Sequence, residues 1–199
     1  HLRQQTDKPN EQPNYCLSDY IAPVETNKQD YVGGFVVTTG LGCDELVAGY
    51  EENHDDYNAI LVKALSDSLA EAFAEKLHEL VRTQYWGYAE SESLTSEELV
   101  KERYQGIRPA PGYPACPDHT EKSSLFRLLN AESESGVSLT ENFAMIPAAS
   151  VSGFYFSHPD SKYFGLGKID RDQVVAYAER KQLSLADTEK WLSPNLKYA

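Results

Sequence analysis

One long stretch of helical periodicity constrains the fold of this chain more than any other feature. Between residues 55 and 85, apolar side chains recur at steps of three and four, which is the spacing of one helix face. This series consists of Tyr57, Ile60, Leu61, Ala64, Leu65, Leu69, Ala72, Phe73, Leu77, Leu80 and Val81. Asp55 and Asp56 stand at its start, where the helix dipole favours negative charge. We therefore expect a long helix whose apolar stripe packs into the core and does not form a cofactor site.

Shorter segments on either side of this helix predict a mixed α+β fold. Residues 32–39 have the β-branched, glycine-bounded composition of a buried strand, and Asp44 can cap a short helix after it. Further helices are predicted at residues 96–104, 120–130, 171–181 and 184–192. Further strands are predicted at residues 138–146, 150–157 and 162–169. This order favours an antiparallel sheet with helices around it over alternating βαβ units.

The composition indicates an acidic globular protein. A chain of 199 residues, 41% of them hydrophobic, is long enough for one large domain with its own core. Its formal net charge of -13 argues against a nucleic-acid ligand, whose phosphates require Lys and Arg. The charge favours a cationic ligand or a basic partner surface, although solubility alone is an equally good explanation.

Targeting signals and cysteine usage favour the cytoplasm. No apolar run reaches the roughly 18 residues of a membrane span, and the N-terminal residues lack the apolar region of a signal peptide. Cys16, Cys43 and Cys116 are odd in number and show no CxxC spacing, so we expect free thiols in a reducing compartment. The first residue is His1 and not Met, which is consistent with a piece of a longer protein.

The segment RPAPGYPACPDH, residues 108–119, predicts a rigid loop. Its four prolines remove four backbone donors and fix their φ angles, which excludes a helix or a central strand. Arg108 supplies a planar guanidinium that suits a carboxylate, and Gly112 would let a ligand approach the main chain closely. This pattern indicates a recognition loop for a small molecule with a carboxylate and a polar ring. A packing or turn role is the alternative.

Two adjacent aromatic residues, Tyr163 and Phe164, follow a turn. In an extended segment their rings would lie on opposite faces. A ring that faces a pocket could attract a sulfonium by a cation–π contact or stack on adenine. An equally good interpretation places both rings in the core.

Common catalytic and nucleotide-binding motifs are absent from the sequence. It contains no GxGxxG, P-loop, HExxH or GxSxG string, and its histidines lack metal-ligand spacing. Glu71, Glu75 and Glu79 on the long helix are most simply its solvated face. The residues alone therefore predict no catalytic centre.

The sequence nevertheless resembles the activation domain of cobalamin-dependent methionine synthase. The strings YQGIRPAPGYPACPDHTEK at residues 104–122 and SVSGFYFSHPDSKYF at residues 150–164 carry this resemblance. HDDYNAILVKALSDSLAEAFAEKLHE at residues 54–79 and WLSPNLKY at residues 191–198 are similar to the family as well. The likeness runs through residues 1–199, which we expect to be the C-terminal part of this domain.

The resemblance implies a fold and a ligand. The fold is an α+β domain with a twisted antiparallel sheet, long peripheral helices and no Rossmann unit. The ligand is S-adenosylmethionine, held in a groove. The binding residues implied by the resemblance are Arg108, Ala110, Gly112, Tyr113, Tyr163, Phe164, Glu102 and Glu71.

The resemblance also implies a role for each of these residues. Arg108 would bind the ligand's carboxylate, while residues 110–113 would meet the ligand through the loop backbone. Tyr163 and Phe164 correspond to the family's paired aromatic position, whose second residue is often Tyr, so Phe164 lacks the hydroxyl of that position. Glu71 and Glu102 correspond to acidic residues near the sulfonium end, which would replace the solvated-face interpretation of Glu71.

By the same resemblance, the module acts in methionine biosynthesis from homocysteine. S-adenosylmethionine donates a methyl group for the reductive reactivation of cob(II)alamin, which a separate module of the methyltransferase holds. Flavodoxin or a flavodoxin-like reductase would supply the electron. The family domain begins well before a segment like this one, and that earlier portion carries an Asp for the ligand's amino group, so we expect incomplete binding. The alternative is a stand-alone binding or interaction fragment without catalysis.

Overall fold

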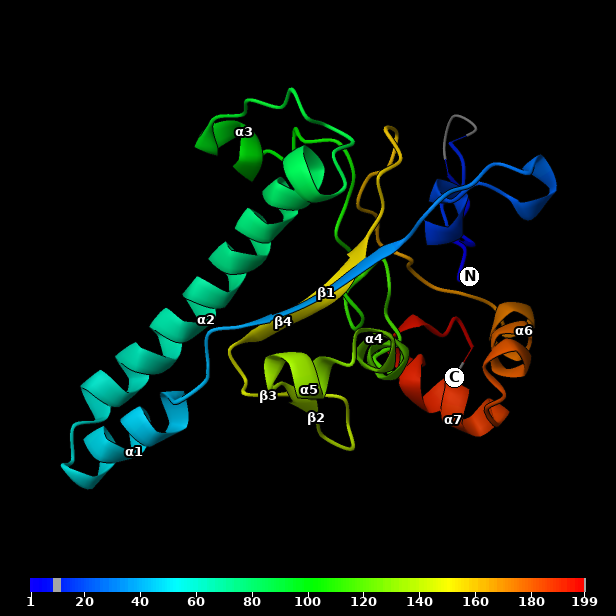
Figure 1. The fold of residues 1–199 in the computed structure, drawn as a ribbon. Helices are drawn as coiled ribbons and strands as arrows, with labels where there is room; N and C mark the ends of the chain where they lie inside the picture. The colour runs from blue at the N-terminus through cyan, green and yellow to red at the C-terminus, as the bar shows by residue number, and fades with distance from the viewer. Residues whose placement is uncertain (9–11, 199) are drawn as a thin grey trace. The chain divides into compact units, whose positions relative to one another are not determined.

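A computed structural model describes residues 1–8 and 12–198 of the chain. These residues form two compact units, each built from segments that are far apart in the sequence (Figure 1). Unit 1 comprises residues 1–33, 105–121 and 154–199, and unit 2 comprises residues 34–104 and 122–153. Both ends of the chain therefore belong to unit 1.

The long helix predicted from the periodicity dominates unit 2. Helix α2 spans Asp56–Leu80 and continues into a π-helical turn at Val81–Tyr85. Asp55 caps the helix because its carboxylate accepts a hydrogen bond from the N–H of Asn58 at 3.1 Å. Helix α1, Cys43–Glu52, packs beside the N-terminal part of α2 (Figure 1). The N-cap residue of α1 is Gly42, and Asp44 lies in the first turn of the helix. The prediction that Asp44 caps this helix is therefore wrong.

The prediction that the apolar stripe of α2 forms core is wrong for most of its large residues. Tyr57 is 76% exposed and Leu69 is 58% exposed, and their neighbours along the stripe are also open to solvent. The residues that α2 buries are Ala59, Ala70, Ala74 and His78. Alanine side chains allow close approach of a neighbouring backbone, so the helix packs through its small residues and turns the large ones outward.

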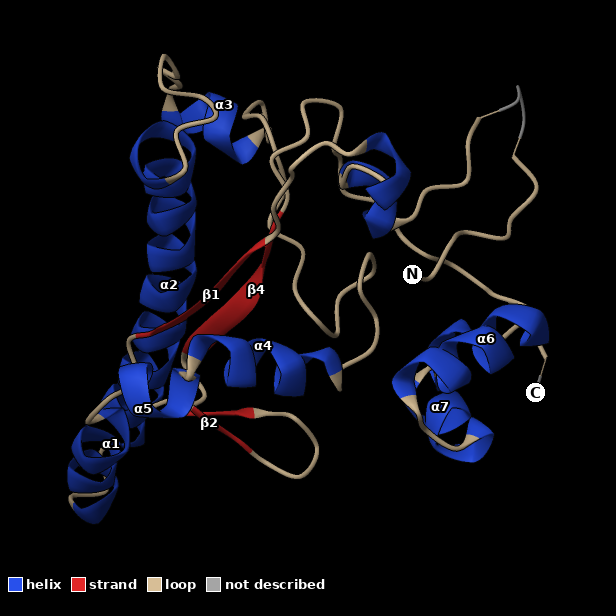
Figure 2. Cartoon of the chain, turned by 45° about the vertical axis from the view of Figure 1, so that its right-hand side comes forward, coloured by secondary structure: helices blue, strands red, loops and turns tan. Residues whose placement is uncertain are grey.

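The core of unit 2 lies around a two-stranded sheet. Strand β1, Gly33–Thr38, pairs with β4, Ser150–Tyr155 (Figure 2). Helices α4, Glu121–Leu129, and α5, Ala131–Ser135, contribute Phe126 and Ala131 to a cluster that includes Val36 of β1. A Cβ atom on Gly34 would lie 2.6 Å from the Leu125 Cδ1 atom, so the glycine permits this close packing.

Smaller elements complete unit 2. Strands β2, Ser138–Leu139, and β3, Met145–Ile146, form a second antiparallel pair in which Ser138 faces Ile146. Helix α3, Ser96–Val100, is shorter than the predicted helix and begins with a capping box between Thr95 and Glu98.

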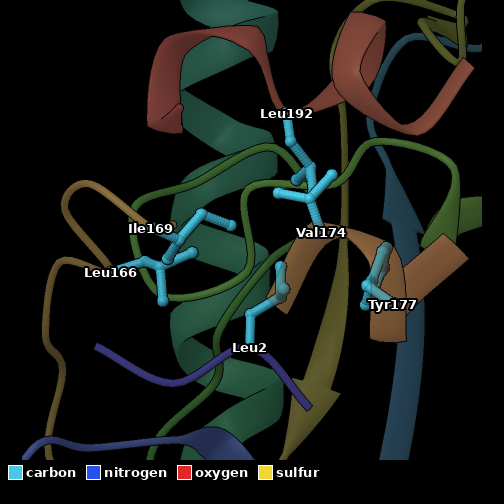
Figure 3. Close-up of a cluster of buried hydrophobic side chains, with 6 residues drawn as sticks. All are labelled: Leu2, Leu166, Ile169, Val174, Tyr177 and Leu192. Atoms are coloured by element: carbon cyan, nitrogen blue, oxygen red, sulfur yellow. The ribbon is translucent and has the colours of Figure 1, made fainter. Parts of the chain in front are cut away.

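Unit 1 has a helical core at the C-terminal end of the chain. Its helices are α6, Arg171–Lys181, and α7, Leu185–Trp191, and its short 3-10 turns lie at Leu17–Tyr20, Val24–Thr26 and Ser193–Asn195. Six side chains converge between these segments (Figure 3), namely Leu2, Leu166, Ile169, Val174, Tyr177 and Leu192. Because Leu2 takes part, the N-terminal segment is fixed to the C-terminal helices.

The predicted strand at residues 162–169 does not form. Its backbone groups bond to separate segments of unit 1, with a single-residue bridge between Ile169 and Leu196 in place of a ladder. The N–H of Leu166 donates to Pro114 O at 2.8 Å, and that of Ile169 donates to Asn195 O at 2.8 Å. Gly167, at φ 72°, turns the chain between these two contacts. The backbone of this segment therefore pairs with two different neighbours instead of one strand.

Candidate functional site

The proline-rich loop, residues 108–119, is fixed at both ends within unit 1. Before it, Ile107 and Phe156 exchange two backbone hydrogen bonds of 3.0 Å each. At its start, Pro109 O accepts from the N–H of Phe154 at 2.9 Å, and Pro111 is fully buried. Prolines keep their carbonyl acceptors although they lack N–H groups, and the loop uses these acceptors to attach to its neighbours.

A tight turn lies inside the loop. The N–H of Gly112 donates to Cys116 O at 2.7 Å, the N–H of Tyr113 donates to Ala110 O at 3.2 Å, and the N–H of Cys116 donates to Tyr113 O at 2.9 Å. The N–H groups of Gly112 and Tyr113 are therefore already used. Contacts of these two residues with a ligand would run through their carbonyl oxygens or through the Tyr113 ring, which is 61% exposed.

Gly112 is required by the loop itself. Its φ of 95° lies in the region that favours glycine, and a Cβ atom there would lie 2.3 Å from the His119 Cε1 atom. The imidazole ring thus fills the space beside Gly112. Close packing of His119 explains this glycine as well as close approach of a ligand does.

The structure brings Arg108 and Tyr163 together. The backbone N–H of Arg108 donates to the Tyr163 hydroxyl at 2.9 Å, although 55 positions separate them in the sequence. Both residues are half-buried. The Phe164 ring centroid lies 5.9 Å from that of Tyr15, and both Tyr163 and Phe164 pack against the cluster of Tyr20, Ile107 and Phe156. The paired aromatics therefore hold the start of the loop in place.

The two predicted acidic residues lie in the other unit. Glu71 is an exposed residue of α2, and Glu102 is an exposed residue shortly after α3 with φ 52°. Six of the eight predicted residues thus share unit 1, while Glu71 and Glu102 belong to unit 2.

A buried polar network behind the loop was not predicted. Asp118 is 2% exposed, and its carboxylate accepts hydrogen bonds from Thr120 N–H at 2.8 Å and from the Tyr177 hydroxyl at 2.6 Å. The Lys181 ammonium lies 3.3 Å from Asp118 and 2.9 Å from Glu121. Burial by itself would raise the pKa of Asp118, but the hydrogen bonds from Tyr177 and Thr120 and the charge of Lys181 outweigh burial and lower it.

The carboxylates of this network, together with burial, favour the neutral forms of Tyr177 and Cys116. Burial, together with the carboxylates of Asp118 and Glu121, raises the pKa of Tyr177. Burial, followed by the same two carboxylates, raises the pKa of Cys116 to about 12. No sequence signal connects Asp118 with Tyr177, because only the fold brings α6 next to the loop.

Two cavities border the loop within unit 1. One, of about 410 Å³, is lined by Cys116, Asp118, Phe154, Phe156 and Arg180 among others. The second, of about 310 Å³, lies along the turn between Gly112, Tyr113 and His119 and the C-terminal residues Trp191 and Asn195. Arg108, Tyr163 and Phe164 line neither of these two cavities. These three predicted ligand contacts therefore lie outside both cavities.

A second unpredicted cluster fixes the C-terminal end of α2 in unit 2. The Arg82 guanidinium is fully buried and forms a two-pronged ion pair with Glu92, at 2.6 and 2.8 Å. It also lies 4.4 Å from the centre of the Tyr104 ring, against which His78 packs edge-on at 5.1 Å. These contacts attach the segment that carries Glu102 to the end of α2.

Within residues 1–8 and 12–198, no group of three or more His, Cys, Asp or Glu side chains could hold a metal ion. None of the helices in that part of the chain is long and apolar enough to cross a membrane.

Two comparisons with known proteins identify relatives of this chain. The model of the vitamin B12 dependent methionine synthase activation domain matches residues 1–182. A solved structure described as the MetH reactivation domain bound to AdoHcy shares 60% sequence identity, with a TM-score of 0.97. The match covers 100% of this chain and 61% of that chain, so this chain spans about three fifths of its length. The predicted α+β fold is confirmed, and the chain belongs to the family of vitamin B12-dependent methionine synthase activation domains.

Proposed function

We propose that this chain binds S-adenosylmethionine and supports the reductive reactivation of cob(II)alamin in a vitamin B12-dependent methionine synthase. The observation that carries the proposal is the rigid, Arg108-led loop, together with membership of the activation domain family. A similar structure with 60% identity has AdoHcy bound, and AdoHcy is what remains of S-adenosylmethionine after methyl transfer. We propose that residues 1–199 form the C-terminal part of the activation domain.

The proposed ligand has three groups that suit side chains of this chain. Its carboxylate fits the guanidinium of Arg108, whose backbone is held by the Tyr163 hydroxyl at 2.9 Å. Its adenine and sulfonium suit the rings of Tyr163 and Phe164, which stack on flat rings and attract cations. The carbonyl oxygen of Gly112 offers an acceptor beside the internal turn. Those of Ala110 and Tyr113 already accept one hydrogen bond each within the turn and keep a second lone pair for the ligand.

The negative net charge of the chain also supports the proposed ligand. The sulfonium and the amino group are cationic, and the chain carries a formal net charge of -13. Glu71 and Glu102 are proposed to lie near this cationic end of the ligand. The Arg82–Glu92 ion pair would hold the segment of Glu102 in position.

The chemistry demands little of the chain beyond positioning. The methyl group leaves the sulfonium while the electron pair of the C–S bond stays on sulfur, so no proton has to be moved. Reduced cobalamin, held by a separate module, supplies the nucleophile. The residues proposed here bind the methyl donor, orient its methyl group outward and exclude water. Flavodoxin or a flavodoxin-like reductase is the proposed electron donor, and the cytoplasm the proposed compartment.

A reactivation assay tests this function. Methionine synthase that lacks its own activation domain would be inactivated to the cob(II)alamin form. It would then be mixed with this chain, the further residues of the MetH reactivation domain that lie outside the match, S-adenosylmethionine labelled in the methyl group, and a reductant. The proposal predicts transfer of the label to cobalamin and recovery of methionine formation. Arg108→Ala should reduce the transfer of label, and the matched control is Arg127→Ala, which removes an exposed arginine of α4 and leaves the loop intact.

The second candidate function is a ligand-binding or interaction fragment without catalysis. The observation that favours it is that the chain spans about three fifths of the similar reactivation domain. It predicts binding of S-adenosylmethionine but no transfer of label, even when the further residues of that domain are supplied. Absence of both binding and transfer would contradict both candidates.

A further inference from the structure

Helix α2 presents an apolar face that lies open to solvent. We define the α2 face by six residues, which are Tyr57, Ile60, Leu61, Leu65, Leu69 and Phe73. Their exposed fractions run from 40% for Leu61 to 76% for Tyr57. Every one of them is an aromatic or a large aliphatic side chain, so the face is a surface that water solvates poorly.

The geometry of the α2 face is that of a packing ridge. Five of its members recur at every fourth position from Tyr57 to Phe73. Residues at this spacing form a row that is inclined to the helix axis, here about 24 Å long at a rise of about 1.5 Å per residue. The ridge lies away from the side that buries Ala59 and Ala70. Rows of this kind fit into the grooves of another packed element.

This face differs from ordinary surface. Single exposed apolar residues are normal, such as Val100 and Leu128 elsewhere in unit 2, whereas contiguous patches beyond a few hundred Å² mark interfaces. The described part of unit 1 offers no matching row. Its large exposed apolar residues come from separate loops and helix ends, and they are Val24, Tyr31, Val32, Tyr113, Val175 and Leu183.

We propose that the α2 face is the docking surface for the part of the activation domain that lies outside this chain. About two fifths of the similar MetH reactivation domain fall outside the match, although all of this chain falls inside it. That further part belongs to the same domain and has to bury apolar surface of its own against the rest of it. The α2 face gathers six of the large exposed apolar residues of the described chain on one helix. The inference needs only the family and the exposure of α2, and is independent of the proposed ligand.

A thiol-labelling experiment tests this proposal on two proteins. One is the 199-residue chain, and the other is the same chain joined, in native order, to the residues of the MetH reactivation domain that lie outside the match. Leu65→Cys places a reporter in the middle of the face. Leu69→Cys is a second reporter, one turn further along, in case the first disturbs folding. Val100→Cys is the matched control, because Val100 is an exposed apolar residue of unit 2 outside the face.

The expected result is at least a tenfold slower labelling of the Leu65→Cys and Leu69→Cys variants in the extended protein, with no change for Val100→Cys. Equal labelling rates in both proteins would overturn the proposal. Protection already present in the 199-residue chain would also overturn it. If that protection grew with protein concentration, a second copy would be the occupant, and if it did not, another part of the same chain would be.

Discussion

The proline-rich loop of unit 1 and helix α2 of unit 2 both come from segments with a clear sequence pattern, but they relate to their surroundings in opposite ways. The loop has no regular structure, yet its carbonyl groups and prolines are bound to neighbours on both sides. Helix α2 is regular throughout, yet most of its large apolar residues touch solvent. A pattern therefore predicts the conformation of a segment better than it predicts what the segment packs against.

The largest expected effect concerns the C-terminal end of α2, where the buried Arg82–Glu92 ion pair lies. Glu92→Ala would leave the buried Arg82 guanidinium without its carboxylate, so we expect the free energy of unfolding to fall by about 3–5 kcal/mol. Urea unfolding followed by circular dichroism measures this loss. Glu97→Ala is the control, because its pair with Lys101 is exposed and should change stability by less than about 1 kcal/mol. Similar losses of unfolding free energy in both variants would show that the Arg82–Glu92 pair does not anchor this end of α2.

Two leucines of unit 2 test the contrast between buried and exposed apolar residues directly. Leu125 is 1% exposed, so Leu125→Ala should lower the free energy of unfolding by about 2–5 kcal/mol. Leu65 is 53% exposed, and in the 199-residue chain Leu65→Ala should cost less than about 0.5 kcal/mol. Thermal and urea unfolding of both variants provide the measurement. A comparable loss at Leu65 would show that the α2 face is buried in this chain after all.

Gly112 tests how tightly the loop is packed. Gly112→Ala would place a Cβ atom against the His119 ring at a positive φ angle, so we expect a loss of about 1–3 kcal/mol in stability. Gly49→Ala is the opposite case, because Gly49 lies within α1 with no atom close to its missing Cβ, and alanine there should add about 0.5–1 kcal/mol. The urea concentration at the unfolding midpoint should therefore fall for Gly112→Ala and rise for Gly49→Ala. A rise for both variants would contradict the close packing of His119 against Gly112.

The smallest expected effect comes from the network behind the loop, and it depends on pH. Tyr177→Phe removes a hydrogen bond to Asp118, which should lower stability at pH 7 by about 1–2 kcal/mol. Asp118 has a lowered pKa in the folded protein, so its contribution is present at neutral pH and is lost as the pH falls through that pKa. The difference between wild type and variant should therefore shrink in acid.

Urea unfolding at a series of pH values from about 7 to about 2, well below the ordinary Asp pKa of about 3.9, follows this change. Tyr31→Phe is the control, because the Tyr31 side chain is 56% exposed. A difference for Tyr177→Phe that stays constant over the whole pH range would show that the Asp118 carboxylate is not involved.

Much of the fold follows from the sequence, because periodicity and capping are local. The long helix, the strand at β1 and the helices α4 and α6 all begin and end near their predicted limits. The strand predicted at residues 162–169 failed because Gly167 turns the chain and its donors find partners far away in the sequence. The exposure of the α2 face was missed for another reason. A periodic stripe shows that one side of a helix is apolar, but it does not show whether another segment covers that side.

The candidate site was predictable only in part. Composition and spacing indicated a rigid loop led by Arg108, and the family resemblance supplied the ligand. The contact between Arg108 and Tyr163 and the network of Asp118, Tyr177 and Lys181 depend on tertiary structure, which no local pattern encodes. The roles of the eight predicted binding residues stay predictions, which binding measurements on single-residue variants can test.

The most direct test of the proposed site is an isothermal titration of the 199-residue chain with S-adenosylmethionine. We predict saturable binding to the wild-type chain and a loss of about 1.5–3 kcal/mol in binding free energy for Arg108→Ala, as for a charge-assisted hydrogen bond. Arg127→Ala should bind as the wild type does. Unchanged affinity of Arg108→Ala would contradict the claim that the proline-rich loop binds the ligand's carboxylate.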